Sequence, residues 1–485
     1  MNINKNVWEK SVKRCKEKGI VLPTFAEQRD PALVPQKVKD QLKGVKMTDV
    51  NPLNLYRITW KNDISTGGFG GVNYLEIPSS LTGIKTRVMG LLGRYFPTGA
   101  HKVGAAYGCL VPRLVTGEFD PTMQKAVWPS TGNYCRGGAY DSALLSCHSI
   151  AILPEEMSKE RFDWLKEIGS EIIATPGCES NVKEIFDKCN ELNRTRGDDI
   201  VIFNQFEEFG NGTWHYNVTA EAILEVFGTL SPAGRGQGEG ARLAAFVSAT
   251  GSAGTICAGD RLKEVHKGCK ITAAEAWQCP TLLNNGFGAH RIEGIGDKHV
   301  PWIHNVKNTD IISAIDDEAC IRLMRMFNEP AGRAFLKAQG VEQGVLDKLN
   351  SLGISGICNL LSSIRTARAL NLGADDAVFT VFTDSMELYG SRLTEEKAKH
   401  GEYTTKDAET DWKRYIIDGN TGEHLVLSEK ERKRVHNLKY FTWIEQQGKE
   451  MGELNAQWND PNYWTSRWRM AGEYDKLIEE FNEIS

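Results

Sequence analysis

Hydrophobic and polar positions alternate along the middle of the chain in blocks that predict strands and helices in turn. Short apolar runs recur between residues 84 and 391, at spacings of roughly 20 to 30 residues that suit strand–helix–strand units. This alternation predicts an α/β protein with mostly parallel sheets covered by helices. We expect strands at residues 87–92, 125–128, 149–153, 171–174, 199–203, 243–248, 270–274 and 377–382.

The helices expected between these strands include one that begins at a lysine. Residues 103–111 form an apolar segment of small side chains, and Lys102 stands directly before it. The preceding turn, Pro-Thr-Gly-Ala-His-Lys at residues 97–102, follows the strand at 87–92, so Lys102 lies at a strand-to-helix junction. Such junctions are where α/β proteins place their chemistry, although most lysines at helix starts are simply solvated. Further helices are expected at residues 159–168, 181–193 and 358–370.

Changes in composition indicate two lobes with an extension at each end. The polar, proline-interrupted start of the chain is expected to be an arm, and the charged, tryptophan-rich end a helical extension that caps a domain or forms a subunit interface. The glycine-rich residues 231–240 are expected to be a surface loop or lobe boundary. The expected parts are an arm at 1–50, a large cofactor-binding lobe at 51–104 and 216–391, a small mobile lobe at 105–215, and an extension at 392–485.

Charge and cysteine content exclude several classes of protein. The 485 residues include 58 Lys and Arg against 63 Asp and Glu, for a formal net charge of −5, without a basic run that could follow a phosphate backbone. We therefore expect no nucleic-acid partner. No apolar run suits a signal peptide or a membrane span, so a cytoplasmic protein with no membrane partner is expected. The 11 cysteines show no metal-ligand spacing, which indicates reduced thiols and no metal.

Two further stretches combine small hydroxyl residues with glycine between a strand and a helix. Ser130, Thr131, Gly132 and Asn133 follow the strand at 125–128, and backbone N–H groups at the next helix start suit a carboxylate or phosphate. The competing interpretation is a turn in which Ser130 or Thr131 only caps the helix.

The second stretch follows the strand at 243–248 and is suited to a phosphate. Its glycines allow close backbone approach to an oxyanion, and its hydroxyls add donors. It lacks the lysine of a Walker A loop and the three-glycine spacing of a dinucleotide fingerprint, so a phosphate monoester is favoured. Its residues are Gly251, Ser252, Ala253, Gly254 and Thr255.

A lysine and two anion loops on one side of a parallel sheet are the parts needed to hold pyridoxal 5′-phosphate and an amino acid. The resemblance is then specific. Residues 97–102 resemble the cofactor-lysine segment of the tryptophan synthase β chain. Ser-Thr-Gly-Asn at 130–133, Asn-Gln-Phe at 204–206, and the loop at 251–255 resemble cysteine synthase and cystathionine β-synthase, as does Thr-Asp-Ser-Met-Glu-Leu-Tyr at 383–389.

These motifs occur in the same order over residues 84–392, so the chain is identified as a member of the fold-type II pyridoxal-phosphate enzymes. The resemblance implies that Lys102 holds the cofactor covalently and moves the substrate Cα proton, with Asn133 on the phenolic oxygen and His101 near the phosphate. Residues 251–255 are implied to bind the phosphate, and Ser130, Thr131 and Gly132 the substrate carboxylate.

Ser385 is implied to face the pyridine nitrogen. A hydroxyl does not keep that nitrogen protonated as a carboxylate would, which favours elimination over transamination. The neighbouring Asp384 reverses this expectation if it points at the ring instead. The competing interpretation for Asp384 is a solvated turn residue.

Tyr134, Cys135 and Arg136 depart from the cysteine synthase pattern, which has threonine and glycine after the asparagine. Tyr134 and Arg136 are candidate substrate-binding residues, and Arg136 either pairs with a second acidic group of the substrate or projects into solvent. Cys135 is either a sulfur carrier at a helix start or a packed thiol.

The expected reaction is β-elimination or β-replacement on a small amino acid, such as cysteine, serine or an O-activated serine, through an aminoacrylate. Two alternatives are a pyridoxal-phosphate-dependent thiolase or aldol-type lyase acting on an oxo amino acid, and a catalytically idle subunit that binds a partner. We expect a homodimer, with the cofactor in the cleft between the two lobes and the small lobe closing over it.

Overall fold

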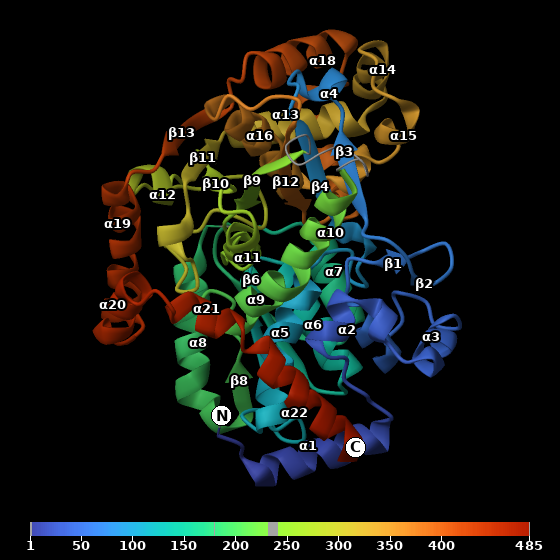
Figure 1. Cartoon of the computed structure of the whole chain (residues 1–485), viewed down its shortest axis with the longest axis vertical. Helices are drawn as coiled ribbons and strands as arrows, with labels where there is room; N and C mark the ends of the chain where they lie inside the picture. The colour runs from blue at the N-terminus through green and yellow to red at the C-terminus, as the bar shows by residue number, and fades with distance from the viewer. Residues whose placement is uncertain (1, 179, 231–240, 485) are drawn as a thin grey trace. The chain divides into compact units, whose positions relative to one another are not determined.

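The computed structural model describes residues 2–178, 180–230 and 241–484, and the chain divides into two compact units (Figure 1). Unit 1 comprises Met1–Asn73, Tyr95–Ala222 and Asp460–Ser485, and unit 2 comprises Tyr74–Arg94 and Ile223–Asn459. Both ends of the chain therefore belong to unit 1. The expected loop at 231–240 lies outside the described residues.

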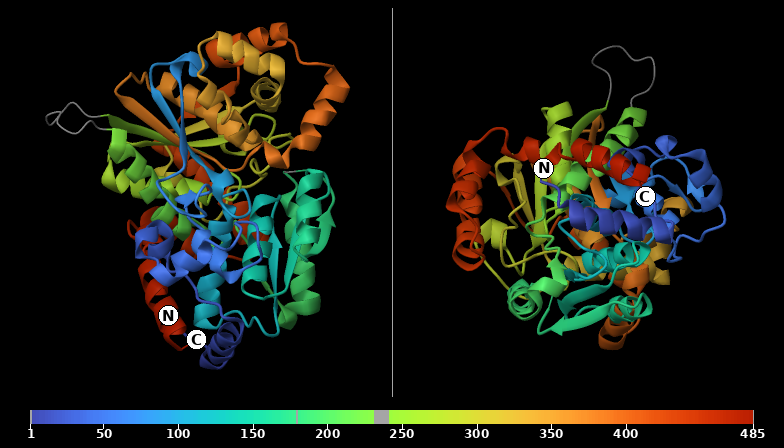
Figure 2. Two further views of the ribbon diagram at one scale, coloured as in Figure 1. Left: turned by 90° about the vertical axis from the view of Figure 1, so that its right-hand side faces the viewer. Right: turned by 90° about the horizontal axis from the view of Figure 1, so that it is seen from below.

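Unit 1 contains a four-stranded parallel sheet in the order β7-β6-β5-β8, and the predicted strands at these places are confirmed. Helices α7 and α8 pack on it, as Figure 2 also shows. Val127, Ile150 and Ile152 of the sheet share an apolar cluster with Ile185 of α8. The elements are β5 (Lys125–Pro129), β6 (Ser149–Pro154), β7 (Glu171–Thr175), β8 (Ile200–Ile202), α7 (Lys159–Glu167) and α8 (Val182–Arg196).

The other layer of unit 1 is organised around helix α5 (Lys102–Thr116), which is almost wholly buried. It packs against α6 (Asn133–Leu144) and α9 (Phe209–Trp214). Gly108 and Gly210 lie so close that a Cβ on either would come within 2.4 Å of the other's carbonyl oxygen. Backbone contact of this kind leaves room only for glycine, and it fixes α5 against α9.

The two ends of the chain pair with each other inside unit 1. The arm forms α1 (Lys5–Lys18) and α2 (Phe25–Arg29), and the chain ends in α22 (Ala471–Ile484). The carboxylate of Asp475 in α22 accepts hydrogen bonds from the amides of Phe25 and Ala26 at 2.6 and 3.2 Å. An acidic side chain at a helix N-terminus satisfies amides that the helix itself leaves unpaired.

Unit 2 contains a seven-stranded sheet in the order β13-β11-β10-β9-β12-β4-β3. Its five inner strands are parallel, and the edge strands β13 and β3 are antiparallel. This agrees with the expected mostly parallel architecture. The strands are β3 (Tyr74–Ile77), β4 (Arg87–Leu92), β9 (Arg242–Ala249), β10 (Lys270–Ala276), β11 (Ile311–Ile315), β12 (Asp376–Phe382) and β13 (Gly422–Val426).

Helix α16 (Ile354–Ala369) crosses this sheet and begins one turn before the predicted segment. Its buried polar side chain Asn359 bridges two strands. The Asn359 carboxamide accepts a hydrogen bond from the Ala249 amide at 2.7 Å and donates one to the Val381 carbonyl, also at 2.7 Å. The end of β9 and the end of β12 are thereby tied to the same helix.

The tryptophan-rich end of the chain closes the interior of both units. Trp443 is fully buried in unit 2 and donates from Nε1 to the Val300 carbonyl at 2.8 Å, while Trp468 is fully buried in unit 1. The extension also supplies the edge strand β13, which its charged composition does not predict. Its other elements are α17 (Gly390–His400), α18 (Thr405–Asp411), η10 (Trp412–Ile417), α19 (Glu429–Asn437), α20 (Met451–Asn459) and α21 (Tyr463–Trp468).

No helix within the described residues combines the length and the apolar character needed to cross a membrane.

Candidate functional site

Lys102 is the first residue of α5, where the sequence places it. The turn before it bends at Gly99, whose φ of +69° favours glycine and whose amide donates to the Phe96 carbonyl at 2.8 Å. The side chain is half-buried, and its Nζ donates to Oε1 of Gln205 at 3.2 Å. Gln205 follows β8 and carries an amide, so the ammonium has a neutral partner there.

His101 is fully buried beside the lysine, between two other rings of unit 1. Its ring stacks on Trp60 at 5.4 Å and meets His215 edge-on at 5.1 Å. Thr219 Oγ1 accepts a hydrogen bond from Trp60 Nε1 at 3.1 Å and lies 2.9 Å from His215 Nδ1. Burial, with the nearby charges of His101 and Lys102, holds the pKa of His215 well below its usual value, so His215 is neutral.

The loop at residues 130–133 leads from β5 into α6 without a capping side chain. Gly132 occupies the N-cap position with a φ of +145°, and the Ser130 hydroxyl accepts from the Gly132 amide at 3.0 Å. The interpretation of Ser130 or Thr131 as a helix cap is therefore wrong. A Cβ on Gly132 would meet the buried Arg161 side chain at 2.6 Å, so glycine alone fits this bend.

Helix α6 lies directly against the start of α5. A Cβ on Gly137 would come within 3.0 Å of the Val103 and Lys102 backbone, so the missing side chain lets the two helices touch. Asn133, the first residue of α6, is 5% exposed. Lys102 and the 130–133 loop are thus brought together within unit 1.

The three residues after Asn133 are all buried in α6. The Arg136 guanidinium lies 4.6 Å from the Trp164 ring and is 3% exposed, so its expected alternative of projecting into solvent is wrong. Tyr134 meets Trp128 edge-on at 5.4 Å. Cys135 donates to the Gly132 carbonyl at 3.0 Å, and burial raises the pKa of its thiol to about 12. Cys135 is therefore a packed thiol and no sulfur carrier.

The expected phosphate loop, residues 251–255, connects β9 to a helical turn within unit 2. The amide of Gly296 donates to the Thr250 carbonyl at 3.1 Å, and a Cβ on Gly251 would lie 2.8 Å from the Gly294 carbonyl oxygen. Ala253 has a φ of +60°, unusual for a residue with a side chain. The loop is thus held tightly curled by the neighbouring residues 294–296.

Ser385 and Asp384 follow β12 and have opposite surroundings. The Ser385 hydroxyl is 1% exposed and has no hydrogen-bond partner among the residues that the structure describes. Asp384 is fully buried, accepts from the Tyr389 hydroxyl at 2.8 Å and packs against Gly353, where a Cβ would lie 1.9 Å from its Oδ1. The interpretation of Asp384 as a solvated turn residue is therefore wrong.

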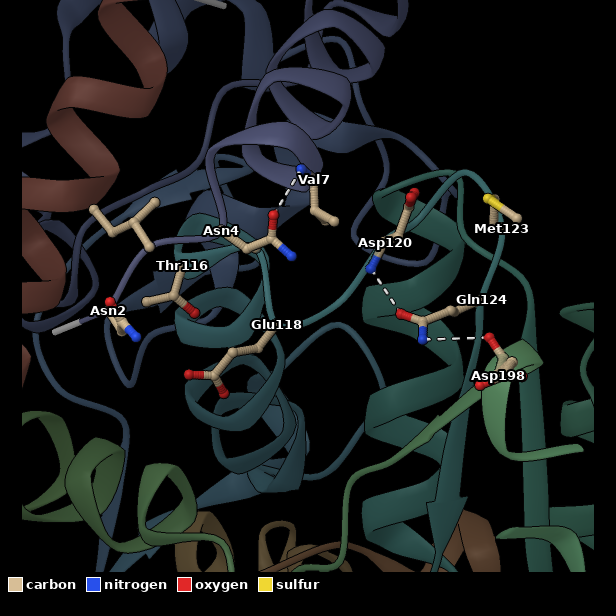
Figure 3. Close-up of a pocket in the computed structure, with 11 residues that line it drawn as sticks. Asn2, Asn4, Val7, Thr116, Glu118, Asp120, Met123, Gln124 and Asp198 are labelled. Atoms are coloured by element: carbon tan, nitrogen blue, oxygen red, sulfur yellow. Dashed lines mark hydrogen bonds between the residues drawn. The ribbon is translucent and has the colours of Figure 1, made fainter. Parts of the chain in front are cut away.

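A pocket of about 590 Å³ in unit 1 lies away from these residues (Figure 3). It opens beside Thr116 and Glu118, at the C-terminal end of α5, roughly 20 Å along the helix from Lys102. Figure 3 shows Gln124 bridging it, accepting from the Asp120 amide and donating to the Asp198 carbonyl. Its lining bears acidic side chains and no part of the lysine site.

The predicted residues form two sets. Unit 1 holds His101, Lys102 and residues 130–136, and unit 2 holds residues 251–255 and Ser385. The sequence did not assign roles to Gln205, Trp60 or Asn359, which contact these sets. In the sequence, each of these residues is only a polar or aromatic residue near apolar ones. Many side chains without a role at a site have the same surroundings, so this pattern did not single them out.

Comparison with known proteins identifies relatives of the chain. Residues 74–337 match the family model described as pyridoxal-phosphate dependent enzyme. A probable cysteine synthase of Bacillus subtilis is 28% identical over 294 residues, which cover 60% of this chain and 85% of that protein. A cystathionine β-synthase of Saccharomyces cerevisiae is 25% identical over 334 residues, covering 66% of this chain and 60% of that protein.

Solved structures show the same fold. A cysteine synthase of Entamoeba histolytica superposes with a TM-score of 0.58 at 22% sequence identity, covering 72% of this chain and 93% of that one. At this identity the likeness concerns the fold alone. The fold-type II architecture inferred from the motifs is confirmed.

Proposed function

Because this chain belongs to the family of pyridoxal-phosphate-dependent enzymes, we propose that it catalyses β-elimination or β-replacement on a small amino acid. The substrates in this proposal carry a leaving group at Cβ, as cysteine, serine and O-activated serine do. The names of its relatives, cysteine synthase and cystathionine β-synthase, support this class of reaction.

The described residues fit pyridoxal phosphate. The buried Ser385 hydroxyl has no protein partner among them, as expected of a group that meets a ring nitrogen of a ligand. The loop at 251–255 carries two glycines and the hydroxyl residues Ser252 and Thr255, a composition that suits a phosphate bound by backbone amides and hydroxyls. When bound, the cofactor supplies an electron sink for the electron pair left on the substrate Cα.

Lys102 performs two tasks in this proposal. It would hold the cofactor covalently, and its Nζ, once free, would take the proton from the substrate Cα. Gln205 Oε1, 3.2 Å from Nζ, accepts a hydrogen bond from the displaced amine and keeps it in place. Because His215 is neutral, it adds no positive charge near Lys102.

The remaining residues bind and orient. Asn133 would hold the cofactor's phenolic oxygen, His101 would support its phosphate, and the loop at 251–255 would bind that phosphate. Ser130, Thr131 and Gly132 hold the substrate carboxylate at the start of α6. Arg136, one turn into the same helix, adds positive charge there, and Tyr134 shapes the wall through its contact with Trp128.

The surroundings of Ser385 are the observation on which the choice of elimination over transamination rests. Its hydroxyl is neutral, and the Asp384 carboxylate beside it is engaged by Tyr389. A hydroxyl at this place would hold the ring nitrogen of the cofactor without keeping it protonated, which would favour loss of the substrate's Cβ substituent. Elimination is therefore favoured over transamination.

The two alternative functions gain no support from the described residues. The oxo-amino-acid lyase, with Tyr134 and Arg136 as substrate selectors, gains no support from the relatives either, since they are named cysteine synthase and cystathionine β-synthase. An idle subunit would not need Lys102 at the start of α5.

Absorbance spectroscopy tests the cofactor assignment. The purified protein with pyridoxal phosphate is expected to be yellow, to lose its absorbance band on borohydride treatment, and to keep no band in Lys102→Ala. Lys85→Ala, at an exposed lysine of unit 2, is the matched control and keeps the band. A colourless protein that ignores added pyridoxal phosphate contradicts the assignment.

Product analysis tests the reaction. The yellow protein is mixed with cysteine, serine and O-acetylserine in turn, and released sulfide, ammonia, acetate and pyruvate are measured. Replacement of Ser385 by Asp is expected to raise transamination relative to elimination. An unchanged ratio means that Ser385 does not face the ring.

We also propose that the protein works in the cytoplasm as a homodimer. The cysteines, all unpaired in the structure, suit a reducing compartment. Light scattering during gel filtration measures the mass, and cell fractionation the location. A monomer of 54.0 kDa contradicts the dimer.

A further inference from the structure

A second pocket, in unit 2, is lined by two arginines on one face of α16. Its volume is about 400 Å³, and it lies between the last turns of α16, the buried ring of Tyr415 in η10, and the turn before β13. Leu361 and Ile364 form an apolar wall. The polar groups are Arg365, Arg368, Thr421, Asp418 and His424.

The arginines of this pocket bind neutral oxygens instead of carboxylates. Arg365 donates to the Gly422 and Gly419 carbonyls at 2.7 and 3.0 Å and to the Thr421 hydroxyl at 2.8 Å. Arg368 donates to the Ile416 carbonyl at 2.7 Å. Each guanidinium carries five N–H donors, so both keep donors beyond these bonds.

Among the described residues, no direct ion pair neutralises the two guanidinium groups of the pocket. Within the described ranges, no carboxylate lies at ion-pair distance from Arg365 or Arg368. The nearest acids are engaged or remote: Asp418 pairs with Lys413 at 2.9 Å, and Glu423 is exposed on β13. Burial lowers the pKa of Arg365 and the charge of Arg368 lowers it further, while Glu423 opposes this in part, as Asp418 does for Arg368. Arg365 in turn contributes to the lowered pKa of His424, after burial.

A structural role explains the bond of Arg368 to the Ile416 carbonyl and the bonds of Arg365, but these occupy only part of each guanidinium. The three bonds of Arg365 tie the 419–422 turn to α16. The Arg368 guanidinium, one turn later, repels that of Arg365, and an anion bound between the two guanidinium groups would relieve this repulsion.

We propose that this pocket binds a small organic anion, whose phosphate or carboxylate group lies between Arg365 and Arg368 and whose apolar part rests on Leu361, Ile364 and Tyr415. The size of the pocket suits a molecule of metabolite dimensions. The site is distinct from the loops assigned to the cofactor, so it does not depend on the proposed function.

Helix α16 connects this pocket to those loops. Asn359, two turns before Arg368, binds the Ala249 amide and the Val381 carbonyl, at the ends of the two strands that lead into residues 251–255 and Ser385. Gly353, just before α16, donates to the Asp384 carbonyl at 3.1 Å. Anion binding is therefore expected to change the affinity for pyridoxal phosphate, and the cofactor to change the affinity for the anion by the same factor. This consequence rests on the proposed function, whereas the binding itself does not.

Calorimetric titration of the protein saturated with pyridoxal phosphate tests the proposal. The probes are AMP, succinate and inorganic phosphate, and saturation keeps them out of the cofactor's phosphate loop. We expect one site that binds AMP or succinate more tightly than inorganic phosphate, because only the organic anions use the apolar wall. Preference for AMP indicates a phosphate ester as the natural ligand, and preference for succinate a dicarboxylate.

The variant Arg368→Gln is expected to weaken binding at least tenfold, because a charge-assisted hydrogen bond is lost. Arg368 is exposed on the helix surface and its loss leaves the turn tied by Arg365, so the melting temperature should be preserved. Lys399→Gln removes one exposed charge from α17 and is expected to leave binding unchanged. Absence of binding by all three probes, or equal binding in Arg368→Gln, overturns the proposal whether or not the enzyme reaction is found.

Discussion

The surroundings of Lys102 in unit 1 and the two loops of unit 2 are built by different kinds of contact. We call Lys102 with His101, Trp60, His215 and Gln205 the lysine region. Packed rings surround its histidines, and one amide holds the lysine Nζ at 3.2 Å. We call residues 249–255 and 381–385 the loop region. There, short backbone contacts and buried polar side chains fix each strand end.

The difference follows from what each region has to do. In the proposed reaction Lys102 changes partner during every turnover, and its hydrogen bond to the neutral Gln205 amide is easily exchanged. The loops hold groups that do not move, so their positions benefit from rigid support. Substitutions in the loop region should therefore weaken cofactor binding, whereas substitutions of Trp60 and Gln205, which surround Lys102, should leave cofactor affinity unchanged.

Acidification is expected to have the largest effect and to act on unit 2. Burial lowers the pKa of His299, His304 and His436 to about 3 from an ordinary 6.5. Below pH 6.5 the unfolded chain binds protons that the folded one refuses, so stability falls from there towards pH 3, by up to about 1.4 kcal/mol per histidine and pH unit. Thermal melting between pH 7 and 5 measures it.

A histidine variant tests whether the buried histidines cause this pH dependence of stability. His436 lies within 3.2 Å of the Leu454 carbonyl through Nε2, a contact that a glutamine amide can replace. His436→Gln is expected to reduce by up to one the number of protons taken up on unfolding, and so to make stability less dependent on pH. His148→Asn, at an exposed histidine of unit 1, is expected to leave the pH dependence unchanged. An identical slope in His436→Gln rules out this origin.

The next largest effect is expected for Asn359→Leu. It leaves the Ala249 amide and the Val381 carbonyl buried without their partner, at a cost of about 3 kcal/mol, and loosens both cofactor loops. Denaturant unfolding measures the loss, and cofactor titration should show at least tenfold weaker binding. Ser363→Ala, which removes a buried hydroxyl of the same helix, should cost about 1 kcal/mol and leave cofactor affinity unchanged.

Lys439→Met is expected to cost about 2 kcal/mol. The buried Lys439 ammonium donates to the Trp302 and His304 carbonyls and to Gln457, at 2.7 to 2.9 Å. Methionine restores the volume but leaves acceptors unsatisfied. Lys307→Met, where the lysine is exposed and donates to the Trp458 carbonyl, should change the unfolding free energy by less than about 0.5 kcal/mol. Equal losses in both variants would contradict the role of burial.

In the lysine region, Trp60→Phe is expected to cost about 1 kcal/mol. It keeps a ring over His101 but removes the hydrogen bond from Nε1 to Thr219. Cofactor affinity should stay within twofold of the wild type. A tenfold loss of affinity here would erase the distinction between the two regions.

Gln205→Leu should have the smallest effect on binding and a visible effect on turnover. The leucine fills the space but no longer accepts a hydrogen bond from Lys102 Nζ. We therefore expect sulfide or pyruvate to be formed several-fold more slowly at saturating cofactor. Gln205→Glu is the matched control, because its carboxylate still accepts from the lysine. If both variants keep full activity, Gln205 does not position the amine.

Much of the architecture could be read from the apolar pattern. Strands such as β6 and β12 are wholly buried, so their residues form continuous apolar runs. The edge strand β13 was missed because it is short and no residue of it is buried, so Gly422–Val426 shows no continuous apolar run. β11 was missed too, although Ile311–Ile315 is buried, because a short apolar run alone does not distinguish a strand from a helix.

The candidate site shows the same division. Lys102, the 130–133 loop and the 251–255 loop were identified because glycine at fixed places between a strand and a helix has a backbone reason that the sequence displays. The sequence does not display burial. For both Asp384 and Arg136 a solvated position was one of two interpretations, yet Asp384 is closed in by Gly353 and Tyr389, and Arg136 by Trp164. These partners come from distant parts of the chain.

The sequence by itself therefore determined the α/β class, the family, and the order of the lysine and the two anion loops, because these depend on local periodicity and on glycine. Only the tertiary structure decided that Asn359 ties two strand ends together, that Ser385 is buried beside an engaged Asp384, and that Arg365 and Arg368 share a pocket with the turn before β13. Burial and charge depend on which distant segments meet, and that is fixed when the chain packs.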